Sequence, residues 1–294
     1  MRRFSLSWRA ELWAMLLPYL LGTLLLVGLP ALMSAVLAFT TYDALTPPAF
    51  VGFANFRVLA ADPIVTTAIS NSLVFIILAV PLRILGALGL ALLLLRPRRG
   101  VAGYRAAAYL PTVIPDVAFA LIWLWIFNPL FGPVNLALDA LGLPSPGWLA
   151  DAETARYPFV VMSVFQIGEG FVVLLAALRG LPPEYFDAGA VDGAGRWASF
   201  RYLTLPLLLP WLALLTFRDV ILSFQWTFTP SFVMTGGDPY YSTLFLPLLI
   251  YEEAFDRFRF GAGSALMLVT FLLSAAIIGG MYLLFRQRGY TADV

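Results

Sequence analysis

The chain has 294 residues, of which 61% are hydrophobic and only 12% charged, and its formal net charge is +1. Soluble domains are about 45–50% apolar and about 25% charged, so a single water-soluble fold is excluded and a lipid bilayer must surround much of the chain. Cysteine and histidine are absent, which excludes disulfides, thiolate metal sites and the commonest general base. All 18 basic residues are arginine, so the chain has neither a Schiff-base lysine nor a G-x-x-x-x-G-K-[ST] phosphate loop.

Six apolar runs are long enough to cross a membrane, which takes about 20 residues in a helix. We expect membrane spans at residues 13–39, 66–95, 104–127, 157–178, 207–224 and 263–285. The first run exceeds the usual 7–15-residue core of a signal peptide, which favours an uncleaved helix. The sequence therefore predicts an all-α polytopic membrane protein, with six transmembrane helices in one domain over residues 1–294.

Arginine is distributed unevenly between the two sides of this six-span arrangement. One side holds Arg2, Arg3, Arg9, Arg96, Arg98, Arg99, Arg105, Arg179, Arg196, Arg201, Arg286 and Arg288. The opposite side holds Arg57, Arg156, Arg257 and Arg259. Because cytoplasmic segments carry the excess of positive charge, both termini are predicted to be cytoplasmic and residues 225–262 to form an external loop.

The cytoplasmic connection at residues 181–206 predicts a short helix outside the hydrocarbon. Two prolines suit the helix start, and Glu184 and Asp187 lie in the first turns, where acids interact favourably with the helix dipole. Small residues follow, and Gly193 permits an exit turn.

This connection resembles the coupling loop of binding-protein-dependent ABC importer membrane subunits. Their pattern is Glu-Ala-Ala, three residues, Gly, nine residues and Ile-x-Leu-Pro. Here the first three places hold Asp187, Ala188 and Gly189, the glycine is Gly193, and the pattern ends at Pro206. The resemblance implies a type I ABC importer permease fold, with a permease domain over residues 1–294. It also implies that the following residues couple to an ATPase: Glu184, Asp187, Ala188, Gly189, Asp192 and Gly193.

A second set of motifs resembles the carbohydrate importers of the maltose and glycerol-phosphate group. It comprises Thr235-Gly-Gly-Asp-Pro239, Tyr251-Glu-Glu-Ala-Phe255 and Phe260-Gly-Ala-Gly-Ser-Ala265. That group carries a similar series of Thr-x-Gly-Gly-Pro, Tyr-x-x-Ala-Phe and Gly-x-x-x-Ala. In this chain an aspartate, Asp238, interrupts the Gly-Gly-Pro part of the first motif. The first motif favours the "first" membrane subunit of the maltose transporter over its shorter-looped partner.

The resemblance implies a set of partners for an ATP-driven sugar importer. A second homologous permease subunit would pair with this chain, a dimer of ATP-binding subunits would lie on the cytoplasmic side, and an extracytoplasmic solute-binding protein would deliver the sugar. ATP and Mg²⁺ would be held by the ATPase subunits, so we expect no cofactor, metal ion, nucleic acid or catalytic residue in this chain. Its expected location is the cytoplasmic (inner) membrane of a bacterium or archaeon, as a multi-pass protein in contact with lipid.

Polar groups deep within the expected spans are the candidates for substrate contact, because they are costly in lipid and usually functional. At 1.5 Å per residue, Glu169 lies about 13 Å and Asp219 about 18 Å from the cytoplasmic ends of their spans, near the middle of a core about 30 Å thick. We expect Gln166 and Glu169 to share one helix face, and Asp219 and Ser223 another. Carboxylates and amides suit the hydroxyl groups of a sugar. The predicted substrate-binding residues are Gln166, Glu169, Asp219, Ser223, Trp226 and Asn71.

Several alternatives stay open from the sequence alone. Either Glu169 or Asp219 could instead pair with Arg218 to hold the helix bundle together. Arg83 is expected to snorkel toward the cytoplasmic end of its span, and Asp116 to cap the helix after its adjacent proline. At the level of function, the alternatives are an ion-coupled secondary transporter with the two acids as ion sites, and an intramembrane enzyme built on a carboxylate pair.

Overall fold

The computed structural model describes residues 8–287 of the chain. They divide into two units: one holds the residues up to 62 together with 250–269, and the other holds 63–249 together with those from 270 onward. Three arginines that enter the predicted orientation, Arg2, Arg3 and Arg288, lie outside the described residues. The prediction of a single domain over residues 1–294 stays a prediction.

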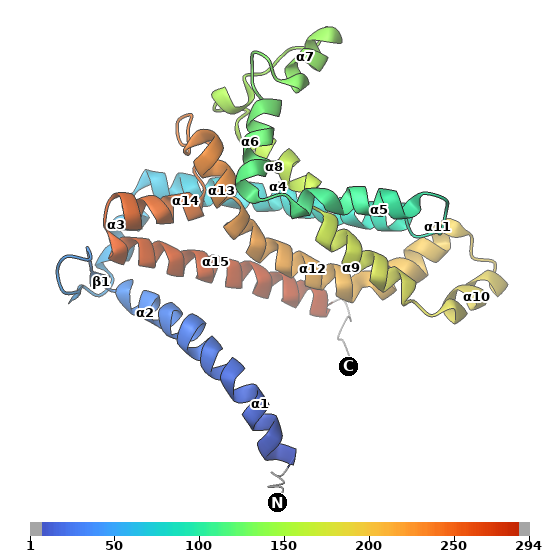
Figure 1. Cartoon of the computed structure of the whole chain (residues 1–294), viewed down its shortest axis with the longest axis horizontal. Helices are drawn as coiled ribbons and strands as arrows, with labels where there is room; N and C mark the ends of the chain where they lie inside the picture. The colour runs from blue at the N-terminus through green and yellow to red at the C-terminus, as the bar shows by residue number, and fades with distance from the viewer. Residues whose placement is uncertain (1–7, 288–294) are drawn as a thin grey trace, which may run out of the picture. The chain divides into compact units, whose positions relative to one another are not determined.

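The first unit consists of a long apolar helix, a small hairpin and a short helix (Figure 1). The long helix is α1 (Trp8–Thr23), a π-helical turn η1 (Leu24–Gly28) and α2 (Leu29–Leu37). Strands β1 (Thr40–Thr41) and β2 (Ala49–Phe50) pair antiparallel, and α3 (Ala54–Ala61) follows. The unit also holds η6 (Glu252–Asp256) and the beginning of α15 (Phe260–Gln287). The two-residue strands are a small exception to the predicted all-α class.

All the regular secondary structure described in the second unit is helical, and this unit carries the candidate site. Its elements are α4 (Pro63–Leu93), α5 (Val101–Tyr109), η2 (Leu110–Val113), α6 (Asp116–Ile126), α7 (Pro133–Ala140), η3 (Trp148–Ala150), α8 (Arg156–Phe165), α9 (Gly168–Arg179), α10 (Pro183–Val191), α11 (Arg196–Ser199), η4 (Phe200–Thr204), α12 (Leu205–Trp226), α13 (Phe228–Pro230) and η5 (Ser231–Thr235). Helix α14 (Leu246–Tyr251) runs across the boundary between the units, and the later part of α15 belongs to the second.

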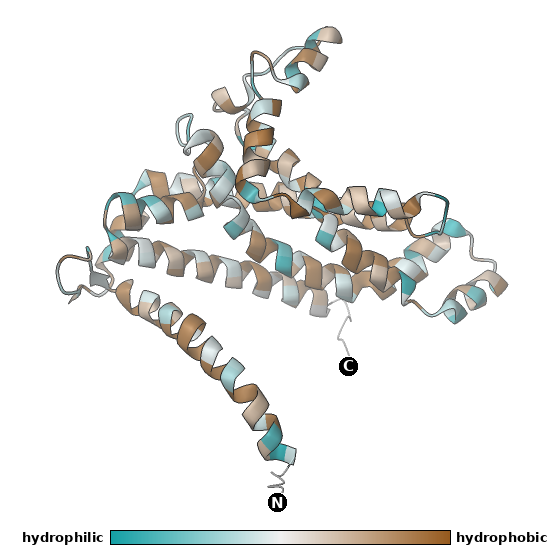
Figure 2. Ribbon diagram, viewed as in Figure 1, coloured by the Kyte–Doolittle hydropathy of each residue, from teal (hydrophilic) through white to brown (hydrophobic). Residues whose placement is uncertain are grey.

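By length and composition, four helical runs of the described residues could each cross a membrane: Trp8–Leu37, Pro63–Leu93, Arg196–Thr235 and Phe260–Phe285. Two further pairs reach that length only together, because each is bent: α5 and η2 against α6 by 100°, and α8 against α9 by 42°. Counting each bent pair as one span gives the six that the sequence predicts. Hydrophobic residues predominate along α1, α2 and α15 (Figure 2).

The predicted fifth span, residues 207–224, lies inside a longer helical run. The helical run extends over 40 residues, Arg196–Thr235. Hydropathy finds only its apolar middle, because polar residues such as Arg201 and Thr235 lower the hydropathy without ending the helical run. The run therefore includes part of the predicted cytoplasmic loop and part of the predicted external loop.

Helices α4, α9 and α12 pack against one another and form the centre of the second unit. In lipid, helix packing relies on close van der Waals contact rather than on the hydrophobic effect, and small residues favour it. Ala87 and Ala91 on α4 are fully buried, and a Cβ at Gly170 of α9 would lie 3.5 Å from the Cβ of Ala87. These small side chains let α4 and α9 approach closely.

The first residue of α9 touches the break in the third span. A Cβ at Gly168 would lie 2.8 Å from Cγ2 of Thr112 and 3.0 Å from Cα of Tyr109. Real Cβ atoms essentially never come as close to a neighbour as the first distance. Only glycine therefore lets the break in the fourth span lie directly against the break in the third.

We predict that Gly168→Ala lowers the thermal stability of the purified protein, while Gly170→Ala in the same helix does not. Both changes gain similar helix propensity. Only the first overpacks a backbone contact, at a cost of about 1–3 kcal/mol. Melting curves in detergent for the two variants would test this, and equal midpoints would contradict it.

Candidate functional site

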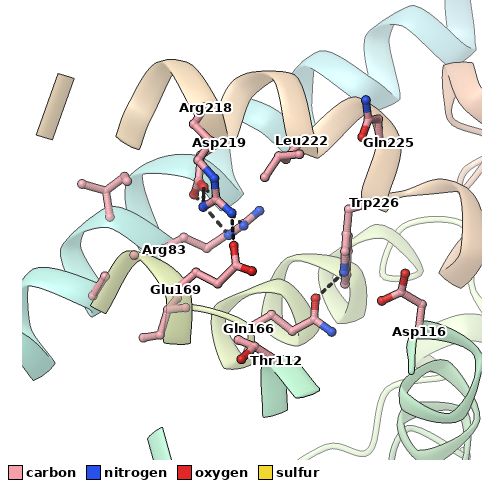
Figure 3. A pocket seen from close by; sticks show the side chains of 14 residues that line it. Arg83, Thr112, Asp116, Gln166, Glu169, Arg218, Asp219, Leu222, Gln225 and Trp226 are labelled. Carbon is pink, nitrogen blue, oxygen red and sulfur yellow. Dashed lines mark hydrogen bonds and ion pairs between the residues drawn. The ribbon is translucent and has the colours of Figure 1, made fainter. Parts of the chain in front are cut away.

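A polar cavity of about 300 Å³ lies within the second unit, among α4, α9, α12 and the two broken spans (Figure 3). It is the best candidate for a binding site because polar side chains from four spans converge on it. Its lining residues are Arg83, Ile84, Ala87, Thr112, Asp116, Gln166, Ile167, Glu169, Gly170, Arg218, Asp219, Leu222, Gln225 and Trp226.

The break in the third span follows from its proline. Ile114 precedes Pro115 and is extended, with ψ of 128°, as expected for a residue whose helical conformation would clash with the proline ring. Helix α6 then begins at Asp116 in a new direction. The break places Thr112 and Asp116 at the cavity wall.

The break in the fourth span lies at Gln166 and Ile167, between α8 and α9. Gln166 and Glu169 therefore do not share one helix face as predicted, because the helix ends between them. Both nevertheless line the cavity. Irregular backbone at membrane depth is tolerated where it lines a cavity or is buried in protein, and both breaks meet that condition.

A buried ion pair joins α4 to α12. The Nε atom of Arg83 lies 3.3 Å from Oδ2 of Asp219, and the two side chains are only 11% and 7% exposed. The expectation that Arg83 snorkels to the end of its span is therefore wrong, because the carboxylate holds its guanidinium inside the bundle. Charges this deep are stable only when paired, so the pair ties α4 to α12 at the cavity.

A second, more open ion pair joins α9 to α12. Arg218 donates to Oε2 of Glu169, whose side chain is 53% exposed, and its other Nη lies 3.8 Å from Oδ1 of Asp219. The predicted alternative was that one of the two acids pairs with Arg218; in the structure Arg218 pairs closely with Glu169 and more loosely with Asp219. Exposed pairs of this kind contribute little to stability, so Glu169 can exchange its partner for a ligand at low cost.

Asp116 is an exposed carboxylate at the cavity wall. It does not cap α6 as expected: the N-cap residue is Pro115, and no side-chain cap bond forms. Within the described part of the chain its carboxylate has no hydrogen-bond or ion-pair partner. Two arginines and three acids line the cavity, so the charge left uncompensated is that of Asp116.

The indole of Trp226 holds the amide of Gln166. Its Nε1–H donates to Oε1 of Gln166 (Figure 3), and its ring stacks on Phe75 with centroids 5.7 Å apart and planes 9° apart. Phe75 therefore fixes the plane of the Trp226 ring. Gln166 and Trp226 both line the cavity.

Two predicted substrate residues do not line the cavity. Ser223 is buried, and its hydroxyl donates to the backbone carbonyl of Asp219 within α12. Asn71 on α4 is also buried and donates to the carbonyls of Tyr241 and Leu244, 2.8 and 3.0 Å away. Asn71 therefore holds the segment before α14 in place. This role could not be predicted from the sequence, because it depends on a contact between distant parts of the chain.

Sequence reasoning passed over Thr112 and Gln225, and it assigned Arg83 and Asp116 to structural roles. All four line the cavity. The proline before Asp116 was the available signal, since a broken span often brings polar groups to a transporter's binding site. Nothing in the local sequence distinguishes Gln225 from an ordinary polar residue at the end of a helix.

The predicted short helix at residues 181–206 is confirmed as α10, Pro183–Val191. Gly193 has φ of +80°, the left-handed conformation that favours glycine, and ends the helix as predicted. A Cβ at Gly189 would lie 2.9 Å from Cδ1 of Leu203, so α10 packs back onto η4 at a residue without a side chain. The residues predicted to couple to an ATPase are exposed except for Gly189, which is half-buried.

Comparison with known proteins identifies a matching family and several relatives of this chain. Residues 83–288 match the family model described as binding-protein-dependent transport system inner membrane component. The chain is 32% identical to a probable ABC transporter permease protein of Pyrococcus horikoshii, over 88% of this chain and 91% of that protein. It is 29% identical to a probable starch degradation products transport system permease protein of Thermoanaerobacterium thermosulfurigenes, over 90% of each.

A solved structure confirms the predicted class of an all-helical polytopic membrane protein. The fold is similar to a chain in the crystal structure of a bacterial alginate ABC transporter in complex with an alginate pentasaccharide-bound periplasmic protein. The TM-score is 0.80 at 24% identity, over 96% of both chains.

We predict that Arg83→Ala destabilises the protein by about 3 kcal/mol, because it leaves the Asp219 carboxylate buried without its main partner. Glu169→Ala, which opens the exposed pair, should cost less than about 1 kcal/mol. The measurement is the midpoint of thermal unfolding in detergent. The double variant Arg83→Met/Asp219→Leu should recover most of the lost stability, because it replaces both buried charges by apolar side chains. Equal effects of the two single changes would contradict the assignment of Arg83–Asp219 as the structural pair.

Proposed function

This chain belongs to the family of binding-protein-dependent transport system inner membrane components, and we propose that it forms half of the translocation pathway of an ATP-driven importer for sugars or sugar derivatives. As a permease subunit of an ABC transporter it lies in the inner membrane and is not itself an ATPase, and partner subunits bind the ATP. The observation that carries the proposal is the polar cavity at the meeting point of two broken spans. Transporters commonly bind substrates at such breaks.

Two kinds of observation support a sugar as the substrate. A relative at 29% identity is named for starch degradation products, and the alginate transporter has a similar fold. The cavity presents carboxylates, amides and a hydroxyl, which match the donors and acceptors of a polyhydroxylated ligand. We assign substrate contact to Gln166, Glu169 and Asp116, with Asp219 and Trp226 behind them.

We further propose the partners of a complete importer: a second homologous permease subunit, a dimer of ATP-binding subunits and an extracytoplasmic binding protein. The alginate transporter was solved with a substrate-bound periplasmic protein, which supports the last of these. Membership of the family removes the ion-coupled transporter and the intramembrane enzyme as alternatives.

We predict that uptake depends on ATP and not on an ion gradient. In proteoliposomes that hold this chain with its partner permease, ATPase and binding protein, uptake from a panel of labelled neutral mono- to trisaccharides should require internal ATP. It should cease with a catalytic-base variant of the ATPase and persist in the presence of an uncoupler. Uptake that survives the ATPase variant but is lost with the uncoupler would overturn the proposal.

The coupling role of residues 181–206 yields a separate prediction. Gly193→Trp should lower the stimulated ATPase activity of the assembled transporter about tenfold, because a left-handed conformation costs a non-glycine residue about 1–2 kcal/mol and the side chain enlarges an exposed turn. Gly195→Trp is the matched control, since Gly195 is equally unobstructed but has φ of −69°. Membrane insertion should be normal in both, and full stimulation in Gly193→Trp would count against the coupling role.

A further inference from the structure

One end of the cavity combines a fixed donor with a free acceptor. Gln166, Asp116 and Trp226 all line the cavity, and they lie next to one another in Figure 3. The Glu169–Arg218 and Arg83–Asp219 pairs occupy the other end of the view. One end of the cavity therefore holds two ion pairs, and the other holds an amide, an indole and a carboxylate.

The orientation of the Gln166 amide follows from its partner. The indole Nε1–H of Trp226 is a donor and cannot accept, so the atom that meets it must be the amide oxygen, Oε1. Within the described residues the amide nitrogen of Gln166 makes no hydrogen bond. Gln166 thus offers two N–H donors to a ligand, and its acceptor is already engaged.

Asp116 complements this donor. An ionised carboxylate only accepts hydrogen bonds, and that of Asp116 has no partner among the described residues. The remaining charged groups at the cavity are compensated within it: Arg83 by Asp219, and Arg218 by Glu169. The cavity wall therefore carries one uncompensated negative charge, and it lies at the end where Gln166 donates.

We propose that Asp116 and Gln166 form a hydroxyl subsite, which takes a neutral hydroxyl group of the substrate and rejects a carboxylate, sulfonate or phosphate there. A hydroxyl can donate to Asp116 and accept from Gln166 at the same time, whereas an anionic group only accepts and meets a like charge. Trp226 is a positioning residue, because it acts on the ligand through Gln166. This inference rests on the proposed function and specifies the substrate group that the site recognises.

The absence of cysteine from the chain allows a direct test. Gln225→Cys places the subunit's one thiol at the cavity wall, where a bound sugar should slow its reaction with a maleimide. The assembled transporter in nanodiscs would be labelled at rising concentrations of two matched probes. These are cellobiose, and cellobiouronic acid, in which a carboxylate replaces one hydroxymethyl group.

We expect cellobiose to protect the thiol at concentrations about tenfold lower than cellobiouronic acid, as repulsion between like charges a few ångströms apart would give. Asp116→Asn should bring the two probes to within threefold of each other. Trp226→Phe, which removes the N–H, should weaken protection by cellobiose. Glu153→Gln is the matched control, since it removes an exposed acid outside the cavity and should leave the tenfold preference unchanged.

The outcomes separate this inference from the function on which it rests. Equal protection by both probes in the parent protein, or a preference that persists in Asp116→Asn, overturns the hydroxyl subsite while ATP-driven sugar uptake still stands. Protection by neither probe, when a transported saccharide of the uptake panel does protect the thiol, overturns the subsite. Protection by no saccharide of that panel also overturns the assignment of this cavity as the sugar site.

Discussion

The candidate site depends on the contact between the backbone of Gly168 and the break in the third span. There α9 begins within 3.0 Å of Thr112 and Tyr109, measured from the position that a Cβ would occupy. Because both spans are interrupted at this contact, the polar residues that flank each interruption face one cavity rather than lipid. The ion pairs on α12 then close the same cavity from another side.

Much of the fold could be predicted because the bilayer imposes simple length and hydropathy rules. The six apolar runs correspond to four continuous helical runs and two bent pairs. The helix at α10 was equally accessible, since prolines, early acids and a later glycine are local signals. The predicted fifth span, residues 207–224, agrees with α12 (Leu205–Trp226) to within two residues at each end. The continuation of the helical run to Arg196 and Thr235 was not accessible, because hydropathy measures solvent preference and not where helical hydrogen bonding ends.

The site was predicted in part, and the errors have physical reasons. Gln166, Glu169, Asp219 and Trp226 were identified by their depth or their place beside a span, and they do meet at one cavity. Asn71 and Ser223 satisfy the same criterion, yet backbone carbonyls use their polar groups. Which partner a buried polar group finds depends on tertiary contacts that spacing along the chain does not encode. For Asp116, a local rule about helix caps gave the wrong role.

Helix α9 is one straight segment of 12 residues, Gly168–Arg179, with the cavity at its first turn and the loop to α10 just beyond its last. At 1.5 Å per residue it is about 18 Å long. A rigid rod of that length that tilts by about 10° about one end moves its other end by roughly 3 Å, which is the length of a hydrogen bond. The helix therefore has the geometry of a lever arm: a tilt of that size about its cytoplasmic end would shift Glu169, at the opposite end, by about the length of a hydrogen bond.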